Sequence, residues 1–346
     1  MAPTLTDITP RPAGLAAVGA AAAVVYLGAL WNGFALDDLT IIVANPLVHG
    51  VSGVWRAFGA SYFPANIDVS AYRPLAVATY ALDWTMRSTA WFHAVNLTWH
   101  VAASVLVAAL AGRWAGDTAG LVAGVVFAVH PVHVEAVAYV VGRNELMAAV
   151  FTLLAVYAAL EHGSLWWSAA AMAAGVLSKE NGAVAPGLIA WAWLTGVRPA
   201  PPRRKLVSFV ASWLVLAIAY TGLRLAVLHG FLGGGNPAPA LLGQGWVTVR
   251  LTAIAALADA ARLLVFPLAL SADYSPDQRT AVHGLLDSRL VLGVLVLGLW
   301  ALLLGWAWRR GRKVEAFGLG WIAIAYSPVA NLLFPTQILI AERTLY

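Results

Sequence analysis

Two adjacent carboxylates, Asp37 and Asp38, are the side chains of this sequence best placed for acid–base chemistry. They follow directly after an uncharged apolar run over residues 13–34, which is long enough to cross a hydrocarbon core of roughly 30 Å as a helix. A cleaved signal peptide fits less well, because its apolar core is only about 7 to 15 residues long. The sequence therefore predicts a pair of carboxylates held at a membrane surface.

We expect the two carboxylates to do different work. Adjacent side chains in an extended loop point to opposite sides, so the pair does not act as one unit. A carboxylate can accept the proton of a hydroxyl group that attacks a substrate. We assign this role of general base to Asp37 and expect Asp38 to orient Asp37 or the acceptor.

The composition indicates a polytopic membrane protein with an all-α bundle of transmembrane helices. Of the 346 residues, 61% are hydrophobic and only 11% are charged, and the mean hydropathy is +0.78. One soluble core cannot bury that much apolar surface. The net charge of +5 comes from short basic runs between apolar segments, which orient a membrane protein and do not indicate a nucleic-acid partner. The absence of cysteine excludes disulfides and thiolate chemistry.

The apolar pattern predicts one transmembrane domain over residues 1–346 with about nine spanning helices. Several of these segments are short, so we expect tilted or interfacial pieces among them. The stretch 246–270 is kept out of the membrane because it carries Arg250, Asp259 and Arg262, each costing about 2.5 to 3.5 kcal/mol at mid-membrane. The predicted spans are 13–34, 91–111, 118–140, 146–160, 164–177, 183–197, 206–228, 289–308 and 315–335.

Basic loops predict the orientation of the chain in the membrane. Lys and Arg concentrate in cytoplasmic loops, and the densest runs lie at 198–205 and 309–313. This places the N-terminus in the cytoplasm, and it places a long first loop (35–90) and an interfacial region (229–288) outside. The expected location is a bacterial inner membrane with the carboxylates facing the periplasm or exterior. We interpret Gly233–Gly235 as a flexible link.

Further polar groups are expected near the carboxylates. His93, Asn96 and His100 recur at helical spacing and form one polar stripe, which indicates either a site facing the bundle interior or helix-to-helix hydrogen bonding. Pro131 is expected to break a helix where His130, His133 and Glu135 gather, close to Glu145. A divalent metal there is possible but not favoured, because the spacing matches no zinc pattern closely. We favour a cluster that holds an anionic headgroup and orients an acceptor.

Several other charged residues have a structural alternative. Lys179 can bind phosphate as a point charge or simply pair with Glu180 at the surface, and Arg224 can snorkel from its helix end. Residues 72–84 are too short to span the membrane, so we expect an interfacial helix with Asp83 toward water.

A series of short motifs occurs in order along nearly the whole chain. Together they resemble the membrane part of the TMTC-type protein O-mannosyltransferases and their bacterial relatives. The motifs are Phe34-Ala35-Leu36-Asp37-Asp38, Asn45-Pro46, Tyr72-Arg73-Pro74-Leu75, Phe92-His93-Ala94-Val95-Asn96, His130-Pro131 with Glu135, Gly142-Arg143-Asn144-Glu145-Leu146, Ser178-Lys179-Glu180, Ala272-Asp273-Tyr274-Ser275 and Ala341-Glu342-Arg343-Thr344-Leu345-Tyr346.

The resemblance implies a GT-C glycosyltransferase fold and inverting transfer of a sugar, mannose or another hexose, from a polyprenyl-phosphate donor to a hydroxyl on a protein or glycan. It also implies C-terminal tetratricopeptide repeats, which this sequence does not contain. We therefore expect a fragment or truncated chain, whose activity depends on the missing part. No cofactor beyond the lipid-linked substrate is implied with certainty.

The departing lipid phosphate needs cations or hydrogen-bond donors. In falling order we expect Arg143, Lys179, His93 and Arg224 to supply them. The wider set of candidate donor-binding or substrate-binding residues adds His130, His133, Glu135, Glu145, Glu180, Arg73, Asp273 and Arg343. The alternative function is a transporter or flippase of a lipid-linked sugar, in which the intramembrane polar groups line a pathway.

Overall fold

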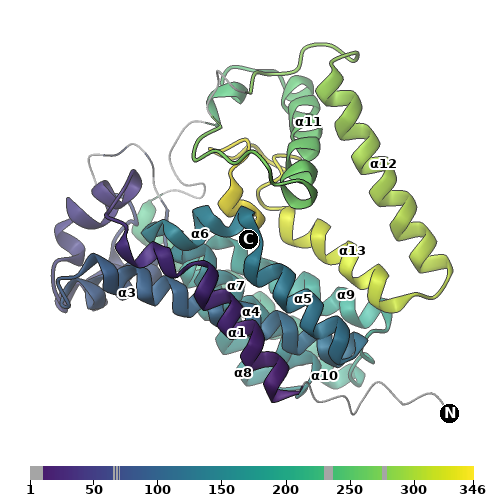
Figure 1. The fold of residues 1–346 in the computed structure, drawn as a ribbon, viewed down its shortest axis with the longest axis horizontal. Coiled ribbons are helices and arrows are strands. Elements are labelled where there is room, and N and C mark those ends of the chain that lie inside the picture. The colour runs from purple at the N-terminus through teal and green to yellow at the C-terminus, as the bar shows by residue number, and fades with distance from the viewer. Residues whose placement is uncertain (1–10, 65–66, 68, 70, 230–236, 275–278) are drawn as a thin grey trace. The chain divides into compact units, whose positions relative to one another are not determined.

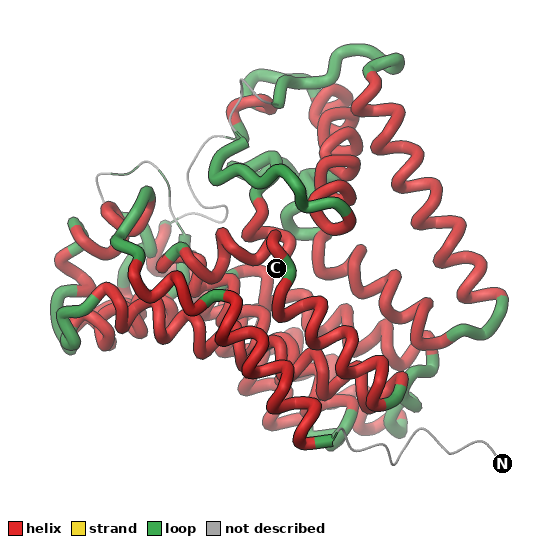
Figure 2. Tube along the Cα trace, in the orientation of Figure 1, coloured by secondary structure: helices red, strands yellow, loops and turns green. Residues whose placement is uncertain are grey.

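The computed structural model describes residues 11–64, 67, 69, 71–229, 237–274 and 279–346, and all regular secondary structure in these residues is helical (Figure 2). The all-α fold class is confirmed. The chain divides into two compact units, one formed by residues 1–189 and 199–234 and the other by residues 190–198 and 235–346. Each unit is described by itself.

Long apolar helices build the body of the first unit (Figure 1). They pack closely because small side chains line their contacts: Val18, Ala22, Ala108 and Ala128 form one buried cluster. Gly120 faces the backbone of the neighbouring helix, where a Cβ would lie 2.6 Å from Gly112 Cα and 2.7 Å from Ala108 O. The helices are α1 (Pro12–Val25), α4 (Thr89–Ala115), α5 (Asp117–Val129), α7 (Arg143–Leu160), α8 (Leu165–Ser178) and α10 (Arg203–Leu228).

The segment between α1 and α4 folds into short helices around a core of its own. These are α2 (Ser52–Arg56) and α3 (Pro74–Trp84), and they cover a buried cluster that contains Tyr62, Tyr80 and Phe92. The short helices predicted in this loop are present. Further along, His130 ends α5 at Pro131, and the chain bends by 49° into residues 131–138, which include α6 (Val134–Ala138). The predicted break at this proline is confirmed.

The second unit consists of α11 (Trp246–Val265), α12 (Ser288–Arg309) and α13 (Lys313–Tyr326). The helix α9 (Ala185–Thr195) contributes its C-terminal part to this unit. The polar residues of α11 are partly satisfied inside the unit: Arg279 binds Asp259 with its Nε and Nη2 atoms 2.8 and 2.6 Å from the carboxylate oxygens. The predicted glycine link at 233–235 lies outside the described residues.

Five helical segments among the described residues are long and apolar enough to span a membrane: 12–31, 89–115, 140–160, 203–228 and 288–309. The bent pair 117–129 and 131–138 gives a sixth if it forms one span. The spans predicted at 164–177, 183–197 and 315–335 correspond to α8, α9 and α13, which have 14, 11 and 14 residues. A straight crossing needs about 20 residues, so all three are short for a full span. The helix α8 has the predicted length, whereas α9 and α13 are shorter than the apolar pattern predicted.

The close approach of α4 and α5 leads to a stability prediction. The change Gly120→Ala forces the two backbones apart, and overpacking of this kind costs about 1–3 kcal/mol. We expect a lower midpoint of thermal unfolding in detergent, measured by tryptophan fluorescence. Gly222→Ala is the matched control, because nothing lies within 4 Å of its Cβ position, and it should leave the midpoint unchanged or raise it. Equal midpoints for the two variants would contradict the packing.

Candidate active site

The two aspartates occupy different environments. Asp38 is only 1% exposed, and its carboxylate oxygens accept hydrogen bonds from the backbone N–H groups of Val141 (2.9 Å) and Ala35 (3.1 Å). The side chain of Asp37 is exposed, while its backbone N–H donates to the Tyr139 hydroxyl at 2.6 Å. Asp38 therefore fastens the loop to residues 139–141, and Asp37 presents its carboxylate outward.

The pKa of Asp38 is raised to about 6. Burial is the largest cause because it disfavours the charged carboxylate, and the backbone hydrogen bonds from Val141 and Ala35 oppose it. Asp37 adds a smaller repulsive contribution that also raises this pKa. The carboxylates of Asp37 and Asp38 thus differ in solvent access as well as in environment, and their expected roles as base and orienting residue stay a prediction.

The polar stripe on α4 faces the interior and positions the segment that holds Asp38. His93, Asn96 and His100 all have zero exposed surface, as the stripe predicted. The Asn96 amide nitrogen donates to the carbonyls of Tyr139 (3.0 Å) and Val140 (3.1 Å). Its amide oxygen accepts from Arg143 Nε at 2.8 Å. The part of the stripe around Asn96 therefore holds helices together, which was the alternative reading.

Arg143 lies at the centre of this bundle and is completely buried. Its guanidinium forms an ion pair with Asp83 and donates to Thr79 Oγ1 (3.2 Å) and to the Phe92 carbonyl (2.9 Å). The predicted orientation of Asp83 toward water is wrong, because Arg143 draws this carboxylate into the protein, where it is 6% exposed. With all its donor atoms engaged and no exposed surface, Arg143 has a structural role here and is not part of the phosphate site we propose below.

The rings of His130 and His133 from the predicted cluster lie close together, and His100 from the polar stripe lies beside His133. The ring centroid of His133 lies 5.8 Å from that of His100 and 5.7 Å from that of His130. His100 and His133 bond the carbonyls of Ala128 (3.0 Å) and Phe127 (2.9 Å). Glu135 is half-buried near them in sequence. Within the described part of the chain, no group of three or more His, Asp or Glu side chains is arranged to hold a metal ion.

His93 stands apart from that cluster. Both of its ring nitrogens are buried, and its nearest polar neighbours include the backbone groups of Asn32 and Gly33. It is next in sequence to Phe92, whose ring packs edge-on against Phe34 at 5.3 Å. His93 therefore lies close to the segment that leads to the two aspartates, and it stays a candidate for binding the substrate.

Two arginines converge on one glutamate elsewhere in the first unit. Glu180 accepts from Arg73 Nε at 3.1 Å and from Arg224 Nη1 at 3.0 Å. The arginine side chains are 18% and 14% exposed, and that of Glu180 is 33% exposed. Burial raises the pKa of Glu180, but the two cations outweigh that effect and lower it to about 2. Arg224 is therefore held by an ion pair with Glu180, and the charge of Lys179 also acts on this carboxylate.

Tyr62 connects this arginine cluster with the aspartate loop. The Arg73 guanidinium lies over the Tyr62 ring, 5.0 Å from its centroid, and the Tyr62 hydroxyl accepts from the Asn144 amide at 3.3 Å. Next to Asn144, Glu145 forms a buried ion pair with Lys179. Burial raises the pKa of Tyr62 to about 12, with the charges of Asp37 and Asp38 acting in the same direction. The two carboxylates and the basic residues thus belong to one electrostatic neighbourhood.

Asp273 and Arg343 lie in the second unit. There Glu342 is 3% exposed and accepts from the backbone N–H of Ser271 (2.6 Å) and from the Tyr274 hydroxyl (2.7 Å). Asp273 is exposed and Arg343 is half-buried. The last two sequence motifs therefore meet each other inside this unit.

The sequence reasoning missed three residues of the first unit. Tyr62 stacks against the predicted site residue Arg73, Tyr139 accepts a hydrogen bond from the backbone of Asp37, and Asp83 pairs with Arg143. Tyr62 lies outside every quoted motif, and nothing in its neighbourhood marked it. Tyr139 follows the His130 motif directly, and its position between two polar clusters was a usable signal.

Comparison with known proteins gives a consistent set of relatives, although no family model and no solved structure matches the chain. A protein O-mannosyl-transferase of Caenorhabditis elegans is 28% identical and aligns with 93% of this chain. Human protein O-mannosyl-transferase TMTC3 is 26% identical over 93% of the chain, and Drosophila melanogaster Tmtc2 is 31% identical over 84%. The chain is homologous to TMTC-type protein O-mannosyl-transferases. It spans 47%, 39% and 33% of the lengths of these three relatives.

The resemblance to the TMTC-type proteins predicted from the ordered motifs is thereby confirmed.

Loss of Arg143 should unfold the site rather than weaken a substrate contact. Removing one partner of a buried ion pair leaves an uncompensated charge and costs about 3–5 kcal/mol. We expect Arg143→Met to lower the thermal midpoint strongly, while the double change with Asp83→Leu recovers part of the loss. The exposed Arg204 gives the control Arg204→Met. A variant at Arg143 as stable as this control would refute the structural role.

The raised pKa of Asp38 predicts a pH dependence of stability. The folded protein keeps the proton of Asp38 up to about pH 6, whereas the unfolded chain releases it near 3.8. Protonation of Asp38 therefore stabilises the fold at pH 4, and that contribution is lost as pH rises through 6. Urea unfolding at several pH values should show the wild type losing stability relative to Asp38→Asn over this interval. A constant difference between the two proteins would contradict the assignment.

Proposed function

We propose that this chain forms the membrane part of a glycosyltransferase that transfers a hexose, mannose in the first instance, from a polyprenyl-phosphate donor to a hydroxyl group of a protein or glycan. The observation that carries this proposal is the similarity to O-mannosyl-transferases over 93% of the chain. The five long apolar helices add the membrane setting. The exposed carboxylate of Asp37 adds a group that can act as base.

In the proposed reaction, Asp37 accepts the proton of the acceptor hydroxyl. The hydroxyl oxygen then forms a bond to the anomeric carbon of the sugar, while the bond between that carbon and the phosphate oxygen breaks. Polyprenyl phosphate leaves with the bonding electrons, and the configuration at the anomeric carbon inverts. The buried Asp38 acts as a positioning residue, because its two backbone hydrogen bonds fix the loop that carries Asp37.

Arg73 and Arg224 are the residues best suited to bind the leaving phosphate. Their guanidinium groups are partly exposed and already meet at one anionic group, the carboxylate of Glu180. A guanidinium matches the geometry of phosphate oxygens through paired N–H donors. A donor phosphate would therefore share or replace the carboxylate of Glu180, with Lys179 near by in sequence as a further cation.

The wider proposal places this site on the outer side of a bacterial inner membrane, within a GT-C type fold. The basic runs at 198–205 and 309–313 support this orientation, since they would face the cytoplasm. The relatives are longer than this chain, and we propose tetratricopeptide repeats in the remainder as the acceptor-binding part. The reaction as written uses the lipid-linked sugar as substrate and no resident cofactor.

The test uses the purified chain in liposomes with polyprenyl-phosphate mannose, labelled in the sugar, and a peptide rich in serine and threonine. We expect label to move from lipid to peptide. Asp37→Asn should lower that rate about 10²–10⁴-fold, the usual contribution of a general base. Arg73→Met and Arg224→Met should raise the donor KM more than they lower kcat at saturating donor.

Asp117→Asn is the matched control, because this carboxylate pairs with Arg11 at the start of α5 and has no place in the proposed site. It should transfer at the wild-type rate. Full transfer by Asp37→Asn would remove Asp37 from the mechanism. Movement of intact labelled lipid across the bilayer without cleavage would replace the proposal with a flippase.

A further inference from the structure

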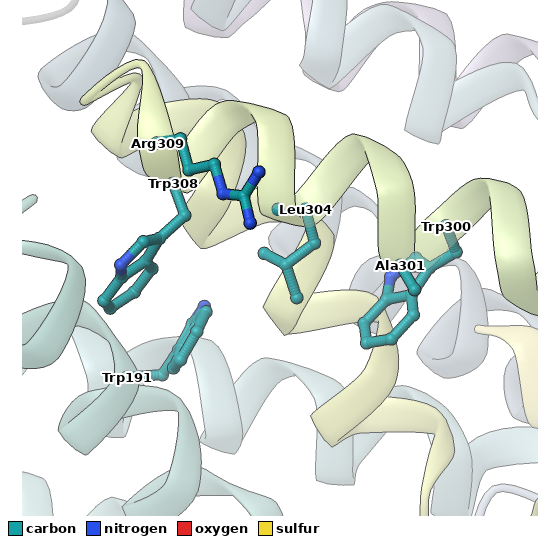
Figure 3. Close-up of a pocket in the computed structure, with 7 residues that line it drawn as sticks. Trp191, Trp300, Ala301, Leu304, Trp308 and Arg309 are labelled. Atoms are coloured by element: carbon teal, nitrogen blue, oxygen red, sulfur yellow. The ribbon is translucent and has the colours of Figure 1, made fainter.

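An apolar groove runs along one face of α12 in the second unit (Figure 3). Its volume is about 390 Å³. Figure 3 shows Trp191 and Trp308 at one end of the groove and Trp300 at the other. The lining residues are Trp191, Trp300, Ala301, Leu304, Gly305, Trp308 and Arg309. None of these residues has a place in the proposed transfer reaction.

The aromatic walls of the groove are held in fixed positions by α13. The indole N–H of Trp191 donates to the carbonyls of Ala316 (3.2 Å) and Phe317 (3.3 Å), and that of Trp300 donates to Leu319 at 3.0 Å. Trp191 also stacks on Trp308, with ring centroids 5.6 Å apart and planes 27° apart. The groove is therefore a preformed feature of this unit.

The floor of the groove follows the helical repeat. Ala301, Leu304, Gly305 and Trp308 lie at intervals of three and four residues, which places them on one face of α12. From 300 to 308 this face is about 12 Å long at 1.5 Å per residue. The small side chains at 301 and 305 leave the space that the tryptophans enclose. Because α12 is long and apolar enough to span a membrane, we expect the open side of the groove to face hydrocarbon.

Positive charge gathers where α12 leaves the apolar region. Arg309 lines the groove and Arg310 follows it, and both are exposed with no ion pair to any residue the structure describes. Arg312 differs, because its Nε donates to Glu315 at 2.8 Å. Lys313 lies against Gly196, whose Cβ position is 3.2 Å from the ammonium nitrogen. Two unneutralised guanidinium groups therefore stand at the polar end of an apolar, tryptophan-walled groove.

We propose that this groove binds one anionic phospholipid drawn from the surrounding bilayer. An acyl chain lies on the floor between Trp191 and Trp300, and the phosphate meets Arg309 and Arg310. The apolar lining requires a hydrocarbon chain, and the paired positive charges favour a lipid with a net negative headgroup over a zwitterionic one. Tryptophan is suited to this depth because its ring is apolar and its N–H is polar.

The test measures lipid binding by native mass spectrometry on the full chain in mild detergent, titrated with phosphatidylglycerol or phosphatidylcholine of the same acyl chains. We expect one phosphatidylglycerol to bind in preference to phosphatidylcholine. In the variant R309Q/R310Q, the ratio of the phosphatidylglycerol affinity to the phosphatidylcholine affinity should fall about fivefold for each arginine removed. This expectation follows because one basic side chain near an anionic lipid headgroup contributes about 1 kcal/mol. The change Gly305→Leu should fill the floor and abolish binding of both lipids at this site while both arginines remain.

The matched control is R203Q/R204Q, an exposed basic pair at the start of α10 that does not line this groove. It should keep the preference of the wild type. Equal losses in the two arginine variants would show diffuse attraction and overturn the proposal. Displacement of the lipid by millimolar inorganic phosphate would show a soluble-anion site and also overturn it. A thermal midpoint near that of the wild type, measured for each variant, establishes that it is folded.

Discussion

The buried ion pair between Arg143 and Asp83 is the interaction on which the first unit depends. Arg143 also binds Asn96 at 2.8 Å and the Phe92 carbonyl at 2.9 Å, so one guanidinium joins α3, α4 and α7. Asn96 in turn holds residues 139–140, and the next residue, Val141, donates to Asp38. The exposed carboxylate of Asp37 is thus the last member of a chain of buried polar contacts. A charge with no exposed surface is tolerated only when every donor is satisfied, and this arrangement satisfies them.

This dependence separates residues that shape the site from residues that can meet a substrate. Arg143 and Asp38 are fully engaged with protein groups, whereas Asp37, Arg73 and Arg224 keep exposed surface. The electrostatic balance of the site is local, because the cations of Arg73 and Arg224 lower the pKa of Glu180 while burial raises that of Asp38. The first unit therefore contains one carboxyl group whose pKa is lowered and another whose pKa is raised.

The sequence predicts the helical class, the membrane setting and the family because these depend on composition, apolar run length and ordered motifs. It also predicts that the α4 stripe is buried. It does not predict the orientation of Asp83, since an isolated acid on a short amphipathic helix looks solvent-facing until its arginine partner, 60 residues further on, is placed beside it. Nor does it predict that groups on α3 and α4 engage the whole guanidinium of Arg143. Ion pairs between helices that are distant in sequence decide which charged side chains remain available to bind a substrate. The order of residues along the chain does not reveal these pairs.

The hydrogen bond from Val141 to Asp38 joins residues 103 positions apart. The loop that carries Asp37 and Asp38 leaves the ribosome long before Val141 does. This loop therefore cannot take its final conformation until α4 and α5 have been made and inserted. The order of biosynthesis therefore delays assembly of the reactive carboxylate until the surrounding helices are in the bilayer. A nascent chain halted before residue 141 would carry both aspartates without the anchor that sets them apart.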